Sequence, residues 1–171
     1  MRKQAGFSIL ELLIVVGVII IVAAIAIPNL LKARVAANEA SAVGSLRAID
    51  AAQIGYLQVY PDLGTYACQL SYLGPPLAGG PVNSTAADLI DMQLASGIKS
   101  GYSFYMDCIP ASVSGSSSYE VQTAPTGASI TGSSCGTNYG RCFYTNSNGG
   151  VYQLNGPGSS NGTAYSLSPI S

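Results

Sequence analysis

A long uninterrupted apolar stretch near the N-terminus constrains this chain more than any other feature. From Leu12 to Leu31 no residue is ionisable, and the basic residues ahead of this stretch are Arg2 and Lys3. A helix of that length is about 30 Å long, which matches the thickness of the hydrocarbon core of a bilayer. The stretch is therefore predicted to span a membrane. Because the basic residues precede it, the N-terminus is expected on the cytoplasmic side and the remainder of the chain is expected to be exported.

Glu11 is the one ionisable residue inside the wider apolar block that begins at Gly6. A carboxylate near the edge of a membrane helix is costly, and it usually faces a partner group. A cut between Gly6 and Phe7 would create an ammonium group four residues before Glu11. That amine is expected to pair with Glu11 of its own chain, or with Glu11 of a neighbouring chain that is displaced along the helix axis.

The residues Gly6-Phe7-Ser8 and Glu11-Leu12-Leu13, in the pattern G-F-S-x-x-E-L-L, follow a basic leader, and Pro28-Asn29 closes the apolar run. This arrangement resembles the class III signal of type IV prepilins and of type II secretion pseudopilins. The resemblance implies that a prepilin peptidase cuts after Gly6 and N-methylates Phe7. It also implies that Glu11 docks each subunit into a filament.

The same resemblance implies a set of partners and a location. The partners are further copies of the chain, the prepilin peptidase and methylase, an inner-membrane assembly platform, and the lipid bilayer before assembly. The location is the bacterial inner membrane, crossed once, and after assembly a periplasmic or cell-surface filament. The subunit of a type IV pilus-like filament and the pseudopilin of a type II secretion system both fit this description.

Two other interpretations of the N-terminus stay open. A conventional secretory signal would use the A-x-A-like site at Ala24-Ile25-Ala26 and leave Ile27 as the first residue. A plain single-pass anchor would keep Met1. In either case the head, secreted or anchored, would be a ligand-binding domain that forms no polymer. Neither interpretation explains Glu11.

The helical pattern resumes after Pro28, which is expected to kink the helix because proline lacks an amide donor and clashes with the preceding turn. The chain is expected to comprise a leader (1–6), a transmembrane and assembly helix (7–31), an amphipathic half of the same helix (32–60) and a globular head (61–171). The charges at Arg34, Glu39, Arg47 and Asp50 are expected largely off the apolar stripe. Close packing of helix on helix or of helix on sheet is expected to explain Gly17, Gly44 and Gly55, and Pro61 is expected to end the helix. The stripe comprises Val35, Ala42, Leu46, Ile49, Gln53, Tyr56 and Tyr60.

The head is expected to fold as a small antiparallel sheet against this helix, which gives an α+β fold of pilin-like type. Residues 61–84 are turn-rich and predicted to form a loop. A short helix over 86–96 is predicted, capped by Ser84 or Thr85 and ended by Gly97. Strands are predicted over 102–108, 119–124, 142–145 and 150–154, with a hairpin turn at 146–150 and a loop over 155–171.

Four cysteines, all in the part predicted to be exported, indicate two disulfides. They are Cys68, Cys108, Cys135 and Cys142. Three pairings are possible, of which Cys68 with Cys108 and Cys135 with Cys142 is favoured. A zinc site is disfavoured, because the chain has no His and the spacings are unlike paired C-x-x-C knuckles.

The composition argues against several functions. Loss of Arg2 and Lys3 with the leader would leave five basic against eight acidic side chains, without the clustered basic face of a nucleic-acid-binding protein. No histidine, nucleophile motif or phosphate-binding glycine loop is present, so neither an enzyme nor a cofactor is expected. No acidic residue follows Glu120, which predicts that the C-terminal calcium site of major pseudopilins is missing and favours a pilin.

Overall fold

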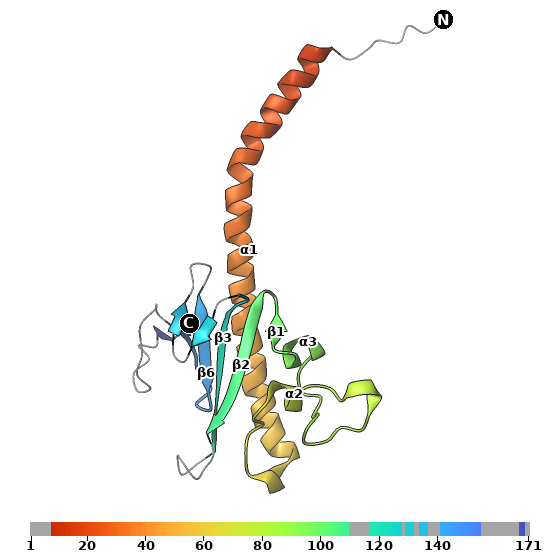
Figure 1. Ribbon diagram of the computed structural model, residues 1–171, viewed down its shortest axis with the longest axis vertical. Coiled ribbons are helices and arrows are strands. Elements are labelled where there is room, and N and C mark those ends of the chain that lie inside the picture. The colour runs from red at the N-terminus through yellow and green to blue at the C-terminus, as the bar shows by residue number, and fades with distance from the viewer. Residues whose placement is uncertain are drawn as a thin grey trace, which may run out of the picture. The chain divides into compact units, whose positions relative to one another are not determined.

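The computed structural model describes residues 8–109, 117–127, 129–131, 134–136, 141–154 and 168–169. The chain divides into two compact units, Met1–Ala37 and Asn38–Ser171. The described part of the first unit belongs to one long helix, and the second unit holds the rest of that helix together with the strands (Figure 1).

Helix α1 runs over Ile9–Val59, a length of 51 residues, and continues through Pro28. It ends one residue before the predicted end at Tyr60, whose amide still donates to the carbonyl of Tyr56. Pro61 follows at once and has no amide to extend the helix, as predicted. By length and composition alone, α1 is long and apolar enough to cross a membrane, with a mean hydropathy of 3.2 in its most apolar stretch.

In the second unit, one face of α1 is buried because its apolar side chains recur every three or four residues. Ala42, Leu46, Ile49 and Tyr56 are at most 3% exposed. They belong to the predicted stripe, and the polar Gln53 is buried with them. The prediction that Val35 belongs to the same stripe is wrong, since Val35 lies in the first unit and is 44% exposed.

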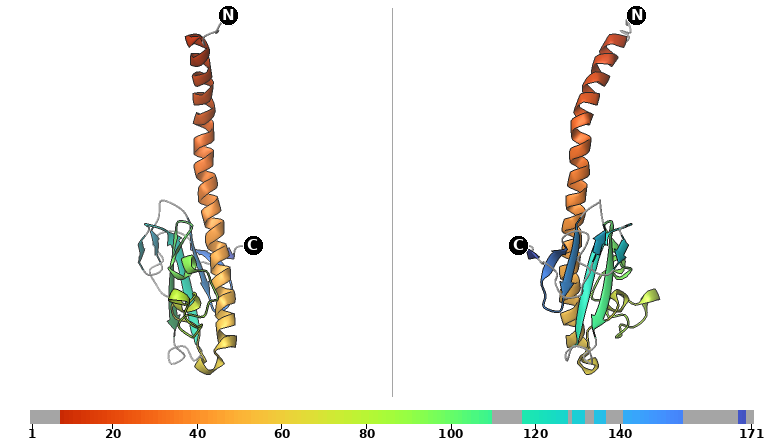
Figure 2. Two further views of the ribbon diagram at one scale, coloured as in Figure 1. Left: turned by 90° about the vertical axis from the view of Figure 1, so that its right-hand side faces the viewer. Right: turned by 60° about the vertical axis from the view of Figure 1, so that its left-hand side comes forward.

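The sheet confirms the α+β prediction. Its six strands are all antiparallel in the order β1-β2-β3-β6-β7-β8, and Figure 2 shows the sheet as a layer beside the helix of this unit. At its centre Val121 pairs with Met106 on one side and with Thr145 on the other. The strands are β1 Ile98–Lys99, β2 Tyr102–Ile109, β3 Ser118–Pro125, β6 Cys142–Asn146, β7 Val151–Leu154 and β8 Ser168–Pro169. A separate pair joins β4 Ser129–Thr131 to β5 Ser134–Gly136.

The core lies between the buried face of α1 and the facing side of the sheet. Strands alternate their side chains between two faces, so each contributes every second residue to this layer. Burying a large apolar side chain contributes about 1.5 to 3 kcal/mol, so this layer is the main source of stability of the head. The sheet residues of the core are Tyr102, Phe104, Tyr119, Val121, Phe143 and Val151.

The segment between α1 and the sheet is more structured than predicted. Instead of a loop over 61–84, it contains the 3-10 helix η1 (Pro61–Leu63), the helix α2 (Leu70–Leu73) and the 3-10 helix η2 (Leu77–Gly79). Leu70 and Leu73 anchor α2, because both are buried in the core.

The predicted helix over 86–96 is wrong in its first half. Helix α3 covers only Met92–Ala95, and its cap is Asp91, whose carboxylate accepts from the amide of Leu94 at 3.0 Å, in place of Ser84 or Thr85. Residues 87–90 instead donate their amides to the carbonyls of residues 72–74. Those donors are therefore unavailable for helical hydrogen bonds.

The hairpin turn between β6 and β7 is confirmed. The amide of Gly149 donates to the carbonyl of Asn146 at 2.9 Å, and Gly149 has a φ of 76°, a left-handed conformation that favours glycine. The prediction that 155–171 is all loop is wrong at Ser168–Pro169, which forms β8, and the other residues of that tail lie outside the described part.

Candidate functional site

The first part of α1 is covered by nothing in the described chain. From Ile9 to Leu31 its large apolar side chains are between 45% and 87% exposed, and none of its most apolar stretch is buried. Each such side chain left in water forgoes about 1.5 to 3 kcal/mol relative to burial. A continuous apolar surface of this size requires lipid or another protein chain as its environment.

Glu11 lies in the first turn of α1 and is exposed between Leu10 and Leu12, which are 68% and 61% exposed. A negative side chain is favourable at this end of a helix because the unpaired amides of the first turn carry partial positive charge. Glu11 has no ion pair with any residue that the structure describes. Its predicted partner, the amine of Phe7, and the predicted cleavage site after Gly6 lie outside the described residues.

Pro28 is accommodated inside α1 without interrupting it. The missing amide of Pro28 leaves the carbonyl of Ala24 without its usual intrahelical donor. The predicted kink at Pro28 stays a prediction.

Close packing within the described chain explains one of the three helix glycines, and packing on a helix of another copy stays a prediction for the other two. A Cβ added at Gly17 or Gly44 would meet no described atom within 4 Å, whereas one at Gly55 would contact Leu89 at 3.8 Å. Packing inside one chain therefore accounts for Gly55 alone among these.

The part of α1 after Leu31 carries two buried acids. Their burial contradicts the prediction that the charged residues of this part lie off the buried face. Arg34 and Arg47 are exposed as predicted, but Glu39 and Asp50 are each only 8% exposed. Because a buried carboxylate is costly without partners, both must be satisfied by groups that α1 itself does not supply.

Glu39 is paired with Arg141, whose side-chain Nε donates to the carboxylate at 2.9 Å and whose amide donates at 3.2 Å. Burial by itself raises the pKa of Glu39, but the hydrogen bonds and charge of Arg141 outweigh it and hold this pKa below the ordinary value of 4.5. The pair joins α1 to the residue immediately before β6.

Asp50 is held by two hydroxyls of the sheet. Tyr119 donates to it at 2.8 Å, and Thr145 donates at 2.8 and 2.9 Å to its two oxygens. Burial raises the pKa of Asp50 above its ordinary value of 3.8, because these hydroxyls offset only part of the desolvation. The site therefore fixes the register between α1 and strands β3 and β6.

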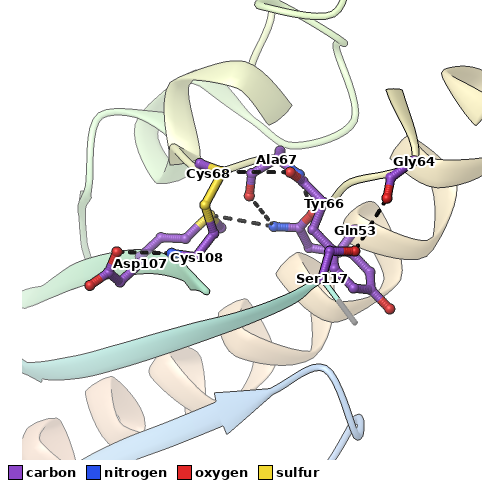
Figure 3. The surroundings of a disulfide bond; sticks show 9 residues. Gln53, Gly64, Tyr66, Ala67, Cys68, Asp107, Cys108 and Ser117 are labelled. Carbon is purple, nitrogen blue, oxygen red and sulfur yellow. Dashed lines mark hydrogen bonds between the residues drawn. A yellow bond between two sulfur atoms is a disulfide. The ribbon is translucent and has the colours of Figure 1, made fainter. Parts of the chain in front are cut away.

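Gln53 is the third polar group on this face, and its position on the apolar stripe was visible in the sequence. Its amide nitrogen donates to the carbonyl of Ala67 at 2.8 Å, and its oxygen accepts from the amide of Ala67 at 2.9 Å. Next to Ala67, Cys68 forms the predicted disulfide with Cys108 on β2 (Figure 3). Together they fasten the segment after α1 to both the helix and the sheet.

Cys142 is also disulfide-bonded, and the side chain of its predicted partner, Cys135, lies outside the described part. Within the described residues, no group of three or more His, Cys, Asp or Glu side chains is placed to hold a metal ion.

Comparison with known proteins gives a family match at the N-terminal end of the chain, where Glu11 and the apolar part of α1 lie. Residues 1–27 match the family described as the prokaryotic N-terminal methylation motif, which confirms the resemblance drawn from Gly6, Phe7 and Glu11. More particularly, the chain is 56% identical over 39 residues to the type IV wide pilus major component PilA4 of Thermus thermophilus. That match covers 23% of this chain and 30% of the relative's length. No solved structure gives a significant match.

Proposed function

We propose that this protein is a structural subunit of a type IV pilus-like filament and not an enzyme. The observation that carries the proposal is the coincidence of a methylation motif with an apolar helix that nothing in the described chain covers. Such a helix has two suitable environments, the bilayer before assembly and a bundle of identical helices afterwards. The similarity to the major component of a type IV wide pilus supports the second.

Processing precedes assembly. A prepilin peptidase hydrolyses the amide bond between Gly6 and Phe7 on the cytoplasmic side, and a methyl donor then methylates the new amine of Phe7. Before extraction the chain crosses the inner membrane once, with Arg2 and Lys3 retained on the cytoplasmic side. An inner-membrane assembly platform then passes the subunit into the filament.

Glu11 sets the axial position of each subunit. In the filament core, the ammonium of Phe7 in one subunit neutralises Glu11 of its neighbour. Desolvating both charges offsets much of their attraction, so the pair contributes specificity more than net stability. The cohesive free energy comes from the apolar side chains between Ile9 and Leu31.

The second candidate is a pseudopilin of a type II secretion system, which would form a short periplasmic filament. The N-terminal methylation motif fits it equally well. The lack of any acidic residue after Glu120 favours the pilin, because the calcium site expected of a major pseudopilin would need such residues. Electron microscopy separates the two, since long surface filaments are expected only for a pilin.

Replacement of Glu11 tests the docking role. Glu11→Ala is expected to insert into the membrane normally and to give no filaments of wild-type length. Glu11→Gln is the matched control for side-chain size, and it is expected to fail in the same way because it also lacks the charge. Sheared filaments counted by electron microscopy provide the measurement, and abundant normal filaments from either variant would refute the role.

A further inference from the structure

The exposed charges of the second unit are unevenly distributed. Two ion pairs are satisfied internally, Lys99 with Asp91 and Arg141 with Glu39. Among the described residues, this leaves Arg47 as the one cation of this unit without an ion pair. Exposed carboxylates without an ion pair in the same residues are Asp62, Asp88 and Asp107.

Arg47 lies on the outward face of α1, opposite the sheet. The exposed residues within two turns of it on that face are small or apolar. Ile54 is 58% exposed, and a Cβ at Gly44 would meet no described atom within 4 Å. Glycine weakens a helix relative to alanine, and no contact inside the described chain explains why it stands there. The other exposed residues within two turns are Ala40, Ala48 and Ala51, and the polar Gln58 follows one turn further along the same face.

The C-terminal end of α1 has the complementary character. Val59 and Leu63 are 57% and 48% exposed, and they flank the exposed carboxylate of Asp62. The last turn of α1 contains no basic residue. The unpaired carbonyls of a helix C-terminus carry partial negative charge, and Asp62 adds a full negative charge beside them. This apolar, electronegative end would be stabilised by a cation.

Arg47 cannot supply that cation within one copy. Twelve residues of α1 separate Arg47 from Val59, which is about 18 Å along the helix at about 1.5 Å per residue. Contact between two different patches of identical chains is heterologous, and when it does not close into a ring it repeats without end as a filament.

We propose that the end of α1 formed by Val59, Asp62 and Leu63 docks on the outward face of α1 in a second copy, with Asp62 paired to Arg47. The inference rests on the filament function proposed above and names the contact through which neighbouring heads associate. Copies anchored in one membrane share one orientation, which excludes a closed antiparallel dimer and leaves an axial displacement of one copy along the other.

The other two carboxylates fit this role less well. One oxygen of Asp107 already accepts from the amide of Cys108 at 2.9 Å. Asp88 has a φ of 54° and stands between the buried Ala87 and the partly buried Leu89, so no exposed apolar surface adjoins it. Asp62 alone of the three combines a free carboxylate with exposed apolar neighbours on both sides.

A charge exchange in the full-length chain tests the contact. Arg47→Asp and Asp62→Arg are each expected to lower the yield of sedimentable filaments at least tenfold through like-charge repulsion. The double variant Arg47→Asp/Asp62→Arg is expected to recover at least half of the wild-type yield. Asp107→Arg is the matched control, an equal change of charge on an exposed carboxylate of the same unit, and it is expected to stay within twofold of wild type.

Each outcome decides the matter. Arg47 and Asp62 are exposed, so folded heads are expected in all variants, and tyrosine fluorescence on unfolding checks this. Normal yields from both single variants, or a folded double variant that recovers nothing, would overturn the contact while leaving the filament function intact. If the wild-type chain forms no filaments under any condition, the filament function fails and the contact fails with it.

Discussion

Helix α1 is rich in apolar residues in both units, but the described residues of the chain cover them in only one. In the second unit Leu46 and Ile49 are fully buried against the sheet, whereas in the first unit Leu13 and Ile19 are 67% and 59% exposed. The two stretches differ in composition as well as in what faces them, because Glu11 is the one ionisable residue between Ile9 and Leu31, whereas the stretch in the second unit carries Glu39, Arg47 and Asp50. The head is complete within one chain, while the first part of the helix requires a bilayer or other copies to cover it.

The acids of the two units differ in the same way. Glu39 and Asp50 find their partners inside the described chain, at Arg141 and at Tyr119 with Thr145. Glu11 finds none among the residues described. The two buried acids of the second unit are therefore paired within the described chain, whereas Glu11 is not.

The largest expected effect comes from making the same substitution, leucine to alanine, in each of the two units. Leu46→Ala leaves a cavity in the core and is expected to lower the free energy of unfolding of the head by about 2 to 5 kcal/mol. Leu13→Ala, the matched change in the first unit, is expected to alter it by less than about 0.5 kcal/mol. Urea unfolding of the full chain in detergent, followed by tyrosine fluorescence, measures the head alone because the first tyrosine is Tyr56. Equal losses of unfolding free energy in the two variants would contradict the claim that the described chain covers α1 in the second unit alone.

Gln53 provides the next test, of a polar group inside the covered region. Gln53→Leu leaves the amide and carbonyl of Ala67 buried without partners, and each lost partner costs about 1 to 3 kcal/mol. The expected loss is about 2 to 4 kcal/mol by the same unfolding measurement. Gln58→Leu, at an exposed position of the same helix, is the control and is expected to be near neutral. An unchanged free energy of unfolding in Gln53→Leu would show that the fold does not depend on the two hydrogen bonds between Gln53 and Ala67.

Acid titration of stability distinguishes the two buried acids. The folded-state pKa of Glu39 is lowered, so its contribution is present above pH 4.5 and is lost as the pH falls through the folded pKa. The folded-state pKa of Asp50 is raised, so its contribution is present below pH 3.8 and is lost as the pH rises through the folded pKa.

Glu39→Gln is therefore expected to cost about 1 kcal/mol at pH 7 and to reduce the loss of stability on acidification. The cost is modest because the side chain of Arg141 is 57% exposed. Asp50→Asn is expected to change the dependence of the free energy of unfolding on pH in the opposite direction. Urea midpoints between pH 2.5 and 7 provide the measurement, and identical slopes in both variants would contradict the assignment.

The smallest effect concerns the outward face of α1. Gly44→Ala is expected to stabilise the head by up to about 1 kcal/mol, because alanine favours the helix and its Cβ meets no described atom within 4 Å. Thermal unfolding of the detergent-solubilised chain measures this gain. A loss of stability would mean that a neighbouring group already occupies that space within one chain.

The sequence was sufficient for those features that depend on local pattern. The end of α1 just before Pro61, the strands near Tyr102 and Tyr119 and the turn at Gly149 follow from residue spacing and turn residues. The apolar helix and the methylation motif could likewise be predicted from the sequence.

What the sequence did not reveal depends on contacts between distant residues. Glu39 meets a partner 102 residues away and Asp50 one 95 residues away, so no local pattern signals their burial. Contacts with a separate segment also explain why α3 is shorter than predicted. The amides of residues 87–90 donate to the carbonyls of residues 72–74 and are therefore unavailable for helical hydrogen bonds.

Mass spectrometry of the mature N-terminus tests the central claim most directly. The account predicts that the native protein, recovered from membranes and from sheared filaments, begins at Phe7 with one added methyl group. A mature chain that begins at Met1 would contradict it, since the amine of Phe7 would not be free to neutralise Glu11 of a neighbouring copy. A mature chain that begins at Ile27 would also contradict it, since Glu11 itself would have been removed.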